Sequence, residues 1–263
     1  MTQESAGWLA IPRPNPWAEL RLICLPYAGG TTATYLPWQH SLPQQVELIA
    51  VQPPGRGNRL GETGFHCVEA LVEALYPELK PHLEQPYVLF GHSMGARIGY
   101  ALVRHLQSRG DDLPAHFIAS ASPAPHVLRD DNVDLRSDEK FIEYLRELGG
   151  TPPEVLANKA IMNFYLPHLR ADFAVASKYY EAPNERLEIP LSIMAGNRDE
   201  QVPVDEVVAW RDVFRLGGEL STLDGGHMFI ESAREAVVAR LNRILQETLA
   251  LLACDGFSTY RSA

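Results

Sequence analysis

Ser93 stands in the pattern Gly-His-Ser-Met-Gly at residues 91–95, an arrangement that can turn a serine hydroxyl into a nucleophile. The apolar run at residues 87–90 predicts a buried strand, and the apolar residues that recur every four positions after it predict a helix. A strand, then G-x-S-x-G, then a helix is typical of a nucleophile elbow. We therefore expect a strained backbone at Ser93, with its hydroxyl exposed at the carboxyl end of a sheet. Glycines are expected on either side because a Cβ there would collide with neighbouring backbone.

A serine hydroxyl becomes strongly nucleophilic when a histidine removes its proton and an acid orients that histidine. His227 follows a predicted strand at residues 219–223, and Asp199 follows one at residues 191–195. The order serine, acid, histidine along the chain is that of α/β-hydrolases. Since each residue comes just after a strand, we expect Ser93, Asp199 and His227 to converge at one edge of the sheet as a catalytic triad.

Nearby residues offer alternatives for these roles. Asp224 is too close in sequence to His227 to reach easily behind its ring. His92 is adjacent to the nucleophile, but at that position of the elbow its side chain should point elsewhere. Asp199 is favoured as the acid over Glu200, Asp205 and Asp224.

A hydrolase of this type also needs backbone N–H groups to bind the oxyanion that forms on the substrate carbonyl. One donor is expected from Met94, the residue after the nucleophile. The second should come from the glycine-rich stretch at residues 27–30, which follows a predicted strand at residues 21–26. We predict the N–H of Ala28, with that of Tyr27 as the alternative. A tight turn without function is the other interpretation of this stretch.

Predicted strands alternate with predicted helices along most of the chain, which indicates an α/β fold with a mainly parallel, doubly wound sheet. The 263 residues and their hydrophobic content of 46% suit one α/β-hydrolase domain spanning residues 1–263. Further strands are expected at residues 46–51 and 116–122, with a short edge strand near residues 8–11. Helices are expected at residues 67–83, 138–148, 159–180 with an interruption at Pro167, 204–214 and 232–252.

Residues 123–188 contain no convincing strand but several helical patterns. An insertion of this size between two strands, on the side of the expected triad, indicates a helical lid within the single domain. Its aromatic residues, Phe164 and Phe173 among them, have two interpretations. They form the core of the lid itself, or they line a channel for an acyl group.

The loop at residues 52–62 is too rich in proline and glycine to be regular structure. It brings Arg56 and Arg59 near the strand ends, where ligands bind in open α/β sheets. We expect these arginines to contact substrate, and a solvated charged loop is the alternative interpretation.

Composition argues against several other classes of function. The formal net charge of −10 argues against a nucleic-acid-binding surface, and no apolar run reaches 18 residues, so no membrane span is expected. The first residues lack the features of a signal peptide, and three widely spread cysteines suit reduced thiols in the cytoplasm. No H-E-x-x-H, Walker or G-x-G-x-x-G pattern occurs, so we expect neither a metal nor a nucleotide.

Several short segments spread over nearly the whole chain are similar to motifs of one known family. The segments are LPYAGG (25–30), PGRGNRLGE (54–62), GHSMGA (91–96), LGGTP (148–152), LPHLRAD (166–172) and GGHMF (225–229). Together they resemble type II thioesterases, the stand-alone editing enzymes of polyketide and nonribosomal peptide synthases. One departure is Ser177-Lys178, where the resemblance leads us to expect an acidic residue.

The resemblance implies a serine thioesterase that hydrolyses acyl groups from the phosphopantetheine arm of acyl or peptidyl carrier protein domains. Such an enzyme removes stalled or aberrant acyl groups. The substrate itself carries the phosphopantetheine, so no cofactor of the enzyme is expected, and we expect a monomer. The candidates for contacts with substrate or lid are Tyr27, Arg56, Arg59, Phe164, Phe173 and Met228.

Two other enzymes fit the same residues, namely a thioesterase that releases medium-chain fatty acids and a general carboxylesterase. A catalytically inactive binding module is a third alternative, against which the intact triad argues. Carrier domains are usually acidic, as is this chain, so docking should use a local basic or apolar patch. The candidate positions for a basic patch are Arg56, Arg59, Arg129 and Arg170.

Overall fold

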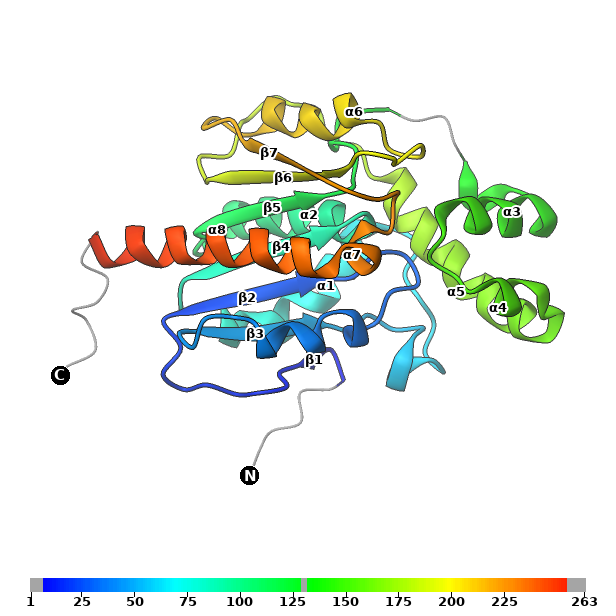
Figure 1. The fold of residues 1–263 in the computed structure, drawn as a ribbon, viewed down its shortest axis with the longest axis horizontal. Coiled ribbons are helices and arrows are strands. Elements are labelled where there is room, and N and C mark those ends of the chain that lie inside the picture. Colours follow the sequence, from blue (N-terminus) through cyan, green and yellow to red (C-terminus); the bar gives the residue numbers. More distant parts are fainter. Residues whose placement is uncertain (1–6, 129–131, 255–263) are drawn as a thin grey trace.

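The computed structural model describes residues 7–128 and 132–254 of the chain (Figure 1). These residues contain a seven-stranded sheet with the order β1-β3-β2-β4-β5-β6-β7. Neighbouring strands are parallel except for β1, which pairs antiparallel with β3. The predicted mainly parallel sheet is therefore confirmed. The strands are β1 (Leu9–Ala10), β2 (Leu20–Leu25), β3 (Val46–Val51), β4 (Tyr87–His92), β5 (His116–Ser120), β6 (Leu191–Gly196) and β7 (Glu219–Leu223).

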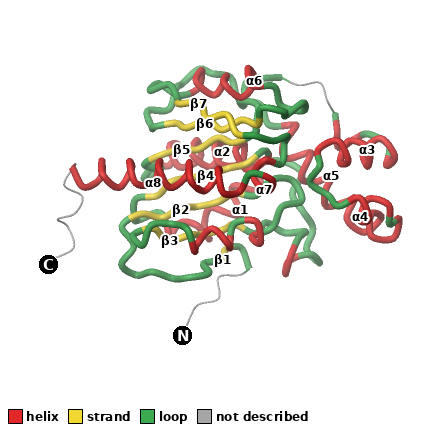
Figure 2. The backbone as a smooth tube through the Cα atoms, viewed as in Figure 1, coloured by secondary structure: helices red, strands yellow, loops and turns green. Residues whose placement is uncertain are grey.

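Helices cover both faces of this sheet, with α8 in front and α1 and α2 behind in the views of Figures 1 and 2. None of the described helices is long and apolar enough to cross a bilayer. The α-helices are α1 (Val68–Leu79), α2 (Met94–Arg109), α3 (Asp138–Leu148), α4 (Pro153–Ala157), α5 (Lys159–Lys178), α6 (Val204–Val208), α7 (Phe229–Ser232) and α8 (Arg234–Cys254). Short 3-10 helices lie at Thr32–Thr34, Leu36–His40, Gly57–Arg59, Lys80–His82, Val133–Leu135 and Ala209–Val213.

The central strands are buried on both faces, which explains their mostly apolar sequences. In β2, Ile23 belongs to a core shared with α1 and α2, while its neighbour Leu22 belongs to a second core shared with α8. Leu89 and Phe90 of β4 divide in the same way. Because successive side chains of a strand point to opposite faces, nearly every position of these strands needs an apolar residue.

The turn between β4 and α2 has the geometry expected of a nucleophile elbow. Ser93 has φ 54° and ψ −118°, a conformation that costs a non-glycine residue about 1–3 kcal/mol. A Cβ on Gly91 would lie 2.3 Å from the carbonyl carbon of Gly95, and one on Gly95 would lie 2.2 Å from the carbonyl oxygen of Leu25. The expected strain and the need for both glycines are confirmed.

Between β5 and β6 the chain leaves the sheet and forms α3, α4 and α5, which we call the helical insertion. These helices lie together beyond the carboxyl ends of the parallel strands (Figure 1). They have a hydrophobic core of their own that includes Phe141 and Leu166. The end of α5 is attached to the main body by Arg97 of α2, whose guanidinium donates to the carbonyls of Ala176 at 3.0 Å and Tyr179 at 2.8 Å.

Some helices differ from the sequence-based expectations. The helix α5 passes through Pro167 without interruption, because packing of its buried face compensates for the hydrogen bond that proline removes. The helices predicted at residues 67–83 and 204–214 each finish as a 3-10 segment. The helix predicted at residues 232–252 begins at Arg234, after the separate short helix α7.

Replacing Gly95 by alanine should destabilise the protein, because the new methyl group would meet the Leu25 carbonyl and neither backbone can move far. We expect a loss of about 3 kcal/mol in the free energy of unfolding, measured by urea titration. Gly61→Ala is the matched control, since no atom lies within 4 Å of the place that its new methyl group would take. Equal unfolding midpoints for the two variants would contradict this account of the elbow.

Candidate active site

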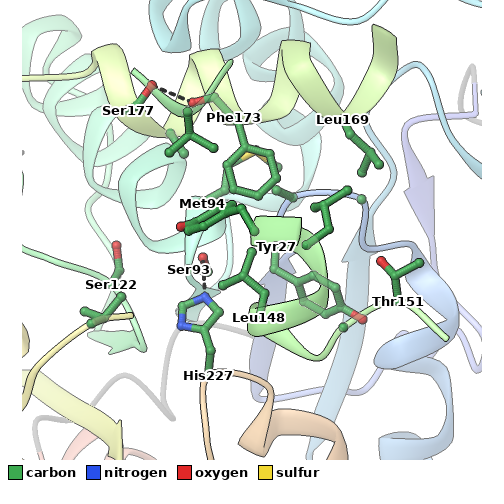
Figure 3. Close-up of a pocket in the computed structure, with 18 of the residues that line it drawn as sticks. Tyr27, Ser93, Met94, Ser122, Leu148, Thr151, Leu169, Phe173, Ser177 and His227 are labelled. Atoms are coloured by element: carbon green, nitrogen blue, oxygen red, sulfur yellow. Dashed lines mark hydrogen bonds between the residues drawn. The ribbon is translucent and has the colours of Figure 1, made fainter. Parts of the chain in front are cut away.

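Three side chains from separate strand ends form one hydrogen-bonded row. His227 Nε2 lies 3.0 Å from Ser93 Oγ, the contact drawn as a dashed line in Figure 3. His227 Nδ1 lies 2.9 Å from Asp199 Oδ2. Ser93 follows β4, Asp199 follows β6 and His227 follows β7. The carboxyl edge of the sheet thus brings together the three residues that the sequence pointed to.

Asp199 holds the imidazole of His227 in one orientation. Its Oδ1 accepts the N–H groups of Gln201 and Val202, both at 3.0 Å, which leaves Oδ2 for His227. Burial by itself would raise the pKa of the Asp199 carboxyl, but the hydrogen bond and charge of His227 and the two N–H donors together lower that pKa below its ordinary value. The ionised carboxylate accepts the Nδ1–H, so Nε2 is free to take a proton from the serine hydroxyl.

The alternative acids lie away from the imidazole. Asp224 is exposed and bonds to Asn197 and Arg198. Glu200 and Asp205 are also exposed. Asp199 is the carboxylate that contacts His227.

The ring of His92 contacts the backbone of His227 rather than the side chain of Ser93. It is fully buried, with Nε2 3.0 Å from the carbonyl oxygen of His227 and Nδ1 2.9 Å from Ser120 Oγ. Since a carbonyl only accepts, Nε2 carries the proton and Nδ1 accepts from the Ser120 hydroxyl. Burial, with a smaller contribution from His227, lowers the pKa of His92 to about 3, so the ring is neutral. This contact could not be predicted, because a single sequence does not show which loop lies over the end of a buried strand.

Residues 27–30 form a tight turn in which the Gly30 N–H donates to the Tyr27 carbonyl at 2.8 Å. Gly29 has φ +76° whereas Ala28 has no positive φ, so this is a type II turn, which needs glycine at its third position. Ala28 and Met94 both line the cavity that contains Ser93. Their positions fit an oxyanion hole built from the two backbone N–H groups.

An apolar cavity of ≈ 680 Å³ lies beside Ser93, between the sheet edge and the helical insertion (Figure 3). Tyr27 and Met228 line it from the sheet side, and Phe173 lines it from α5. These three belong to the residues expected to contact substrate or lid. Many residues of the segment that holds the helical insertion line the cavity too, among them Leu145, Leu148, Thr151, Met162 and Leu169. The lining suits a hydrocarbon acyl group.

The expectation that Arg56 and Arg59 contact substrate is corrected by the structure, since both are buried and neither lines the cavity. Arg56 forms an ion pair with Asp172 of α5. The guanidinium of Arg59 lies 4.1 Å from the centre of the Trp8 ring and pairs with Glu62 at 2.6 Å. A charged group taken out of water needs such partners. Arg59 therefore stabilises its own loop, and Arg56 joins that loop to α5.

Phe164 also lies outside the cavity. It is about half exposed on α5 and packs against Tyr165 and His168. Phe173, nine residues further along α5, lines the cavity instead.

The expected docking patch stays a prediction, but the structure makes some of its candidate arginines less accessible. Arg56 and Arg59 are buried, and Arg170 is paired with Asp138 at 2.6 Å. Arg129 lies outside the described residues.

The chain matches the family model of the thioesterase domain over residues 20–245. The chain belongs to the thioesterase family. Among the relatives of this thioesterase, gramicidin S biosynthesis protein GrsT of Aneurinibacillus migulanus is 33% identical over 244 residues, which cover 92% of this chain and 95% of that protein. Thioesterase PikA5 of Streptomyces venezuelae is 32% identical over 228 residues, which cover 86% of this chain and 81% of that protein.

Similarity extends to solved structures. The type II thioesterase BorB from the borrelidin biosynthetic cluster aligns with a TM-score of 0.81 at 34% identity, covering 94% of this thioesterase and 100% of that chain. The predicted α/β-hydrolase fold and the resemblance to type II thioesterases are confirmed. Family membership and the row of serine, histidine and aspartate together make this protein a thioester hydrolase.

Replacing His92 by glutamine should make stability less sensitive to acid. The unfolded chain binds a proton at His92 below about pH 6.5, whereas the folded protein does so only near its lowered pKa of about 3. The neutral ring of His92 therefore contributes its full share of the unfolding free energy above about pH 6.5. As the pH falls below this value towards about 3, that share decreases by about 1.4 kcal/mol per pH unit. Urea unfolding between about pH 4 and pH 6 should show a slope smaller by that amount in the variant. The exposed His40→Gln serves as control, and an unchanged slope in His92→Gln would count against a neutral buried ring.

Proposed function

We propose that this thioesterase hydrolyses acyl thioesters held on the phosphopantetheine arm of carrier protein domains. It would remove stalled or aberrant acyl groups during polyketide or nonribosomal peptide biosynthesis. The observation that carries the proposal is the near-full-length similarity to a protein described as a type II thioesterase from a biosynthetic cluster. The pairing of Ser93 with His227 beside an apolar cavity supports it, because the cavity can hold the acyl chain while the thioester carbonyl reaches the serine.

The reaction begins when His227 Nε2 takes the hydroxyl proton of Ser93 while Oγ attacks the thioester carbonyl carbon. The N–H groups of Ala28 and Met94 stabilise the oxyanion. The C–S bond then breaks, and the thiol leaves with the proton that His227 returns. Water attacks the acyl-serine with His227 again as base, which releases the free acid and regenerates Ser93. Phosphopantetheine arrives with the substrate, so no cofactor of the enzyme enters these steps. We further propose that the enzyme acts as a monomer in the cytoplasm.

Ser93→Ala should abolish turnover, with a loss of roughly 10⁴-fold or more in kcat, because alanine has no side-chain oxygen with which to form the acyl-enzyme. Asp199→Asn should lower kcat by a similar order, since the imidazole would lose its orientation and tautomer. Release of free thiol from an acyl-pantetheine thioester gives the rates. Ser108→Ala is the control, because the exposed hydroxyl of Ser108 donates to the carbonyl of His105. Appreciable turnover by Ser93→Ala would remove the nucleophile from the proposal.

A panel of acylated carrier proteins tests the substrate class directly. Mass spectrometry should show loss of the acyl group from the phosphopantetheine arm at a higher kcat/KM than for the same acyl group on coenzyme A or on a p-nitrophenyl ester. A preference for the simple ester would favour a general carboxylesterase. Selective release of medium-chain fatty acids, with short or misprimed acyl groups left on the carrier, would favour a fatty acyl-releasing thioesterase.

A further inference from the structure

One carboxylate of α5 contacts the turn at residues 27–30. Asp172 Oδ2 accepts a hydrogen bond from the N–H of Gly29 at 2.7 Å, and its Oδ1 accepts one from Nη2–H of Arg56. The side chains of Arg56 and Asp172 are only 6% and 5% exposed. The two opposite charges therefore form a buried ion pair. The second carboxylate oxygen, Oδ2, bonds to the backbone of the turn.

Arg56 holds the same turn from the loop after β3. Its Nη1 donates to the carbonyl of Gly30 at 3.4 Å, and its Nε and Nη2 donate to the carbonyl of Pro54, each at 3.3 Å. Gln52 joins the same two loops, accepting the Thr32 N–H at 2.9 Å and donating to the Arg56 carbonyl at 3.1 Å. The turn is thus fixed between α5 and a loop that is itself held by buried hydrogen bonds.

The carboxylate at Gly29 also selects the type of turn. In a type II turn the peptide group between the second and third residues is turned over relative to a type I turn. Rotation of this peptide would replace the Gly29 N–H by the Ala28 carbonyl in front of Asp172, so that two acceptors would face each other. Asp172 therefore favours the form of the turn that is observed.

We propose that Asp172 is a positioning residue that holds the oxyanion-binding N–H of Ala28 in place through the backbone of Gly29. The inference rests on the proposed function, in which Ser93 is the nucleophile and Ala28 an oxyanion donor. Such a donor is effective only when it is fixed in advance at hydrogen-bond distance from the developing charge. A Cβ on Gly29 would lie 2.8 Å from Leu169, which lines the cavity from α5. The helix that faces the acyl chain is thus packed directly on the turn that it holds.

Asp172→Asn in the full-length enzyme tests the proposal with an acyl-pantetheine thioester as substrate. We expect kcat to fall roughly ten- to a hundredfold with little change in KM, somewhat less than the complete loss of an oxyanion donor. Asp138→Asn is the matched control, because this carboxylate of the helical insertion pairs with Arg170 and has no contact with the turn. An Asp172→Asn variant with the kcat of the wild type would overturn the proposal.

A second variant separates positioning from folding, because an unpaired Arg56 could destabilise the protein. Arg56→Met combined with Asp172→Leu removes both charges, and apolar replacement of a buried ion pair is often neutral or stabilising. This double variant should unfold cooperatively with a Tm near that of the wild type and still have a low kcat. A folded double variant with wild-type kcat would also overturn the proposal.

Two inhibitors give a readout that a purely structural role would not move. A trifluoromethyl ketone analogue of the acyl-pantetheine forms a tetrahedral oxyanion with the serine, whereas the matching thioether has no carbonyl. In Asp172→Asn the Ki of the ketone should rise by the factor by which kcat/KM falls, and the Ki of the thioether should not change. An equal loss for both inhibitors would mean general damage to binding and would overturn the proposal.

Ser93→Ala, assayed alongside, distinguishes failure of the proposed function from failure of the positioning role. If it keeps its activity, the proposed function fails whatever the Asp172 variants do. If it is inactive while the Asp172 variants turn over like the wild type, only the positioning role fails.

Discussion

The hydrogen bond between His227 and Ser93 joins residues 134 positions apart in the sequence, and the site depends on it. In the sheet, β5 and β6 separate β4 from β7, so the segment after β7 has to reach back across two strand ends. There the backbone carbonyl of His227 accepts the ring N–H of His92, a residue of the strand that presents the nucleophile. His227, the catalytic base, is thereby attached to β4, which precedes Ser93, as well as to β7, which it follows.

Buried polar contacts fix the helical insertion in the same way. Polar contacts attach the helix α5 to the main body, through Asp172 at the turn of residues 27–30 and through Arg97 at the carboxyl end of the helix. Apolar packing is tolerant of small shifts, whereas a buried charge that loses its partner is costly. These contacts therefore hold α5 in one position relative to the sheet. They also fix the part of the cavity wall that α5 forms.

Much of the fold could be predicted because the sheet is buried on both sides. Residues 48–51 of β3 are all apolar and show no alternation of polar and apolar side chains, as expected of a strand buried on both faces. The glycine pattern around Ser93 leaves few conformations for the elbow. Ser93, Asp199 and His227 each come directly after a parallel strand, and this is enough to predict that they meet, since parallel strands end at one edge.

The remaining features depend on contacts that local patterns do not encode. Arg56 looks like a solvated or substrate-binding residue until its partner is known, and that partner is 116 positions away on α5. Pro167 is a helix breaker by its own chemistry, and only the packing of α5 shows why the helix continues. The direction of the His92 side chain follows from the loop after β7, which lies over the end of β4.

Catalysis and acyl recognition draw on different parts of the chain. The reactive side chains follow strands of the sheet, whereas much of the cavity wall comes from residues 133–180, whose helices have a core of their own. Substitutions in that wall can change the room for an acyl group without disturbing the backbone around Ser93. A descendant enzyme could thus acquire a new acyl preference by mutation of this segment alone. Asp172 is the exception within the segment, because its carboxylate bonds to the backbone of the turn at residues 27–30.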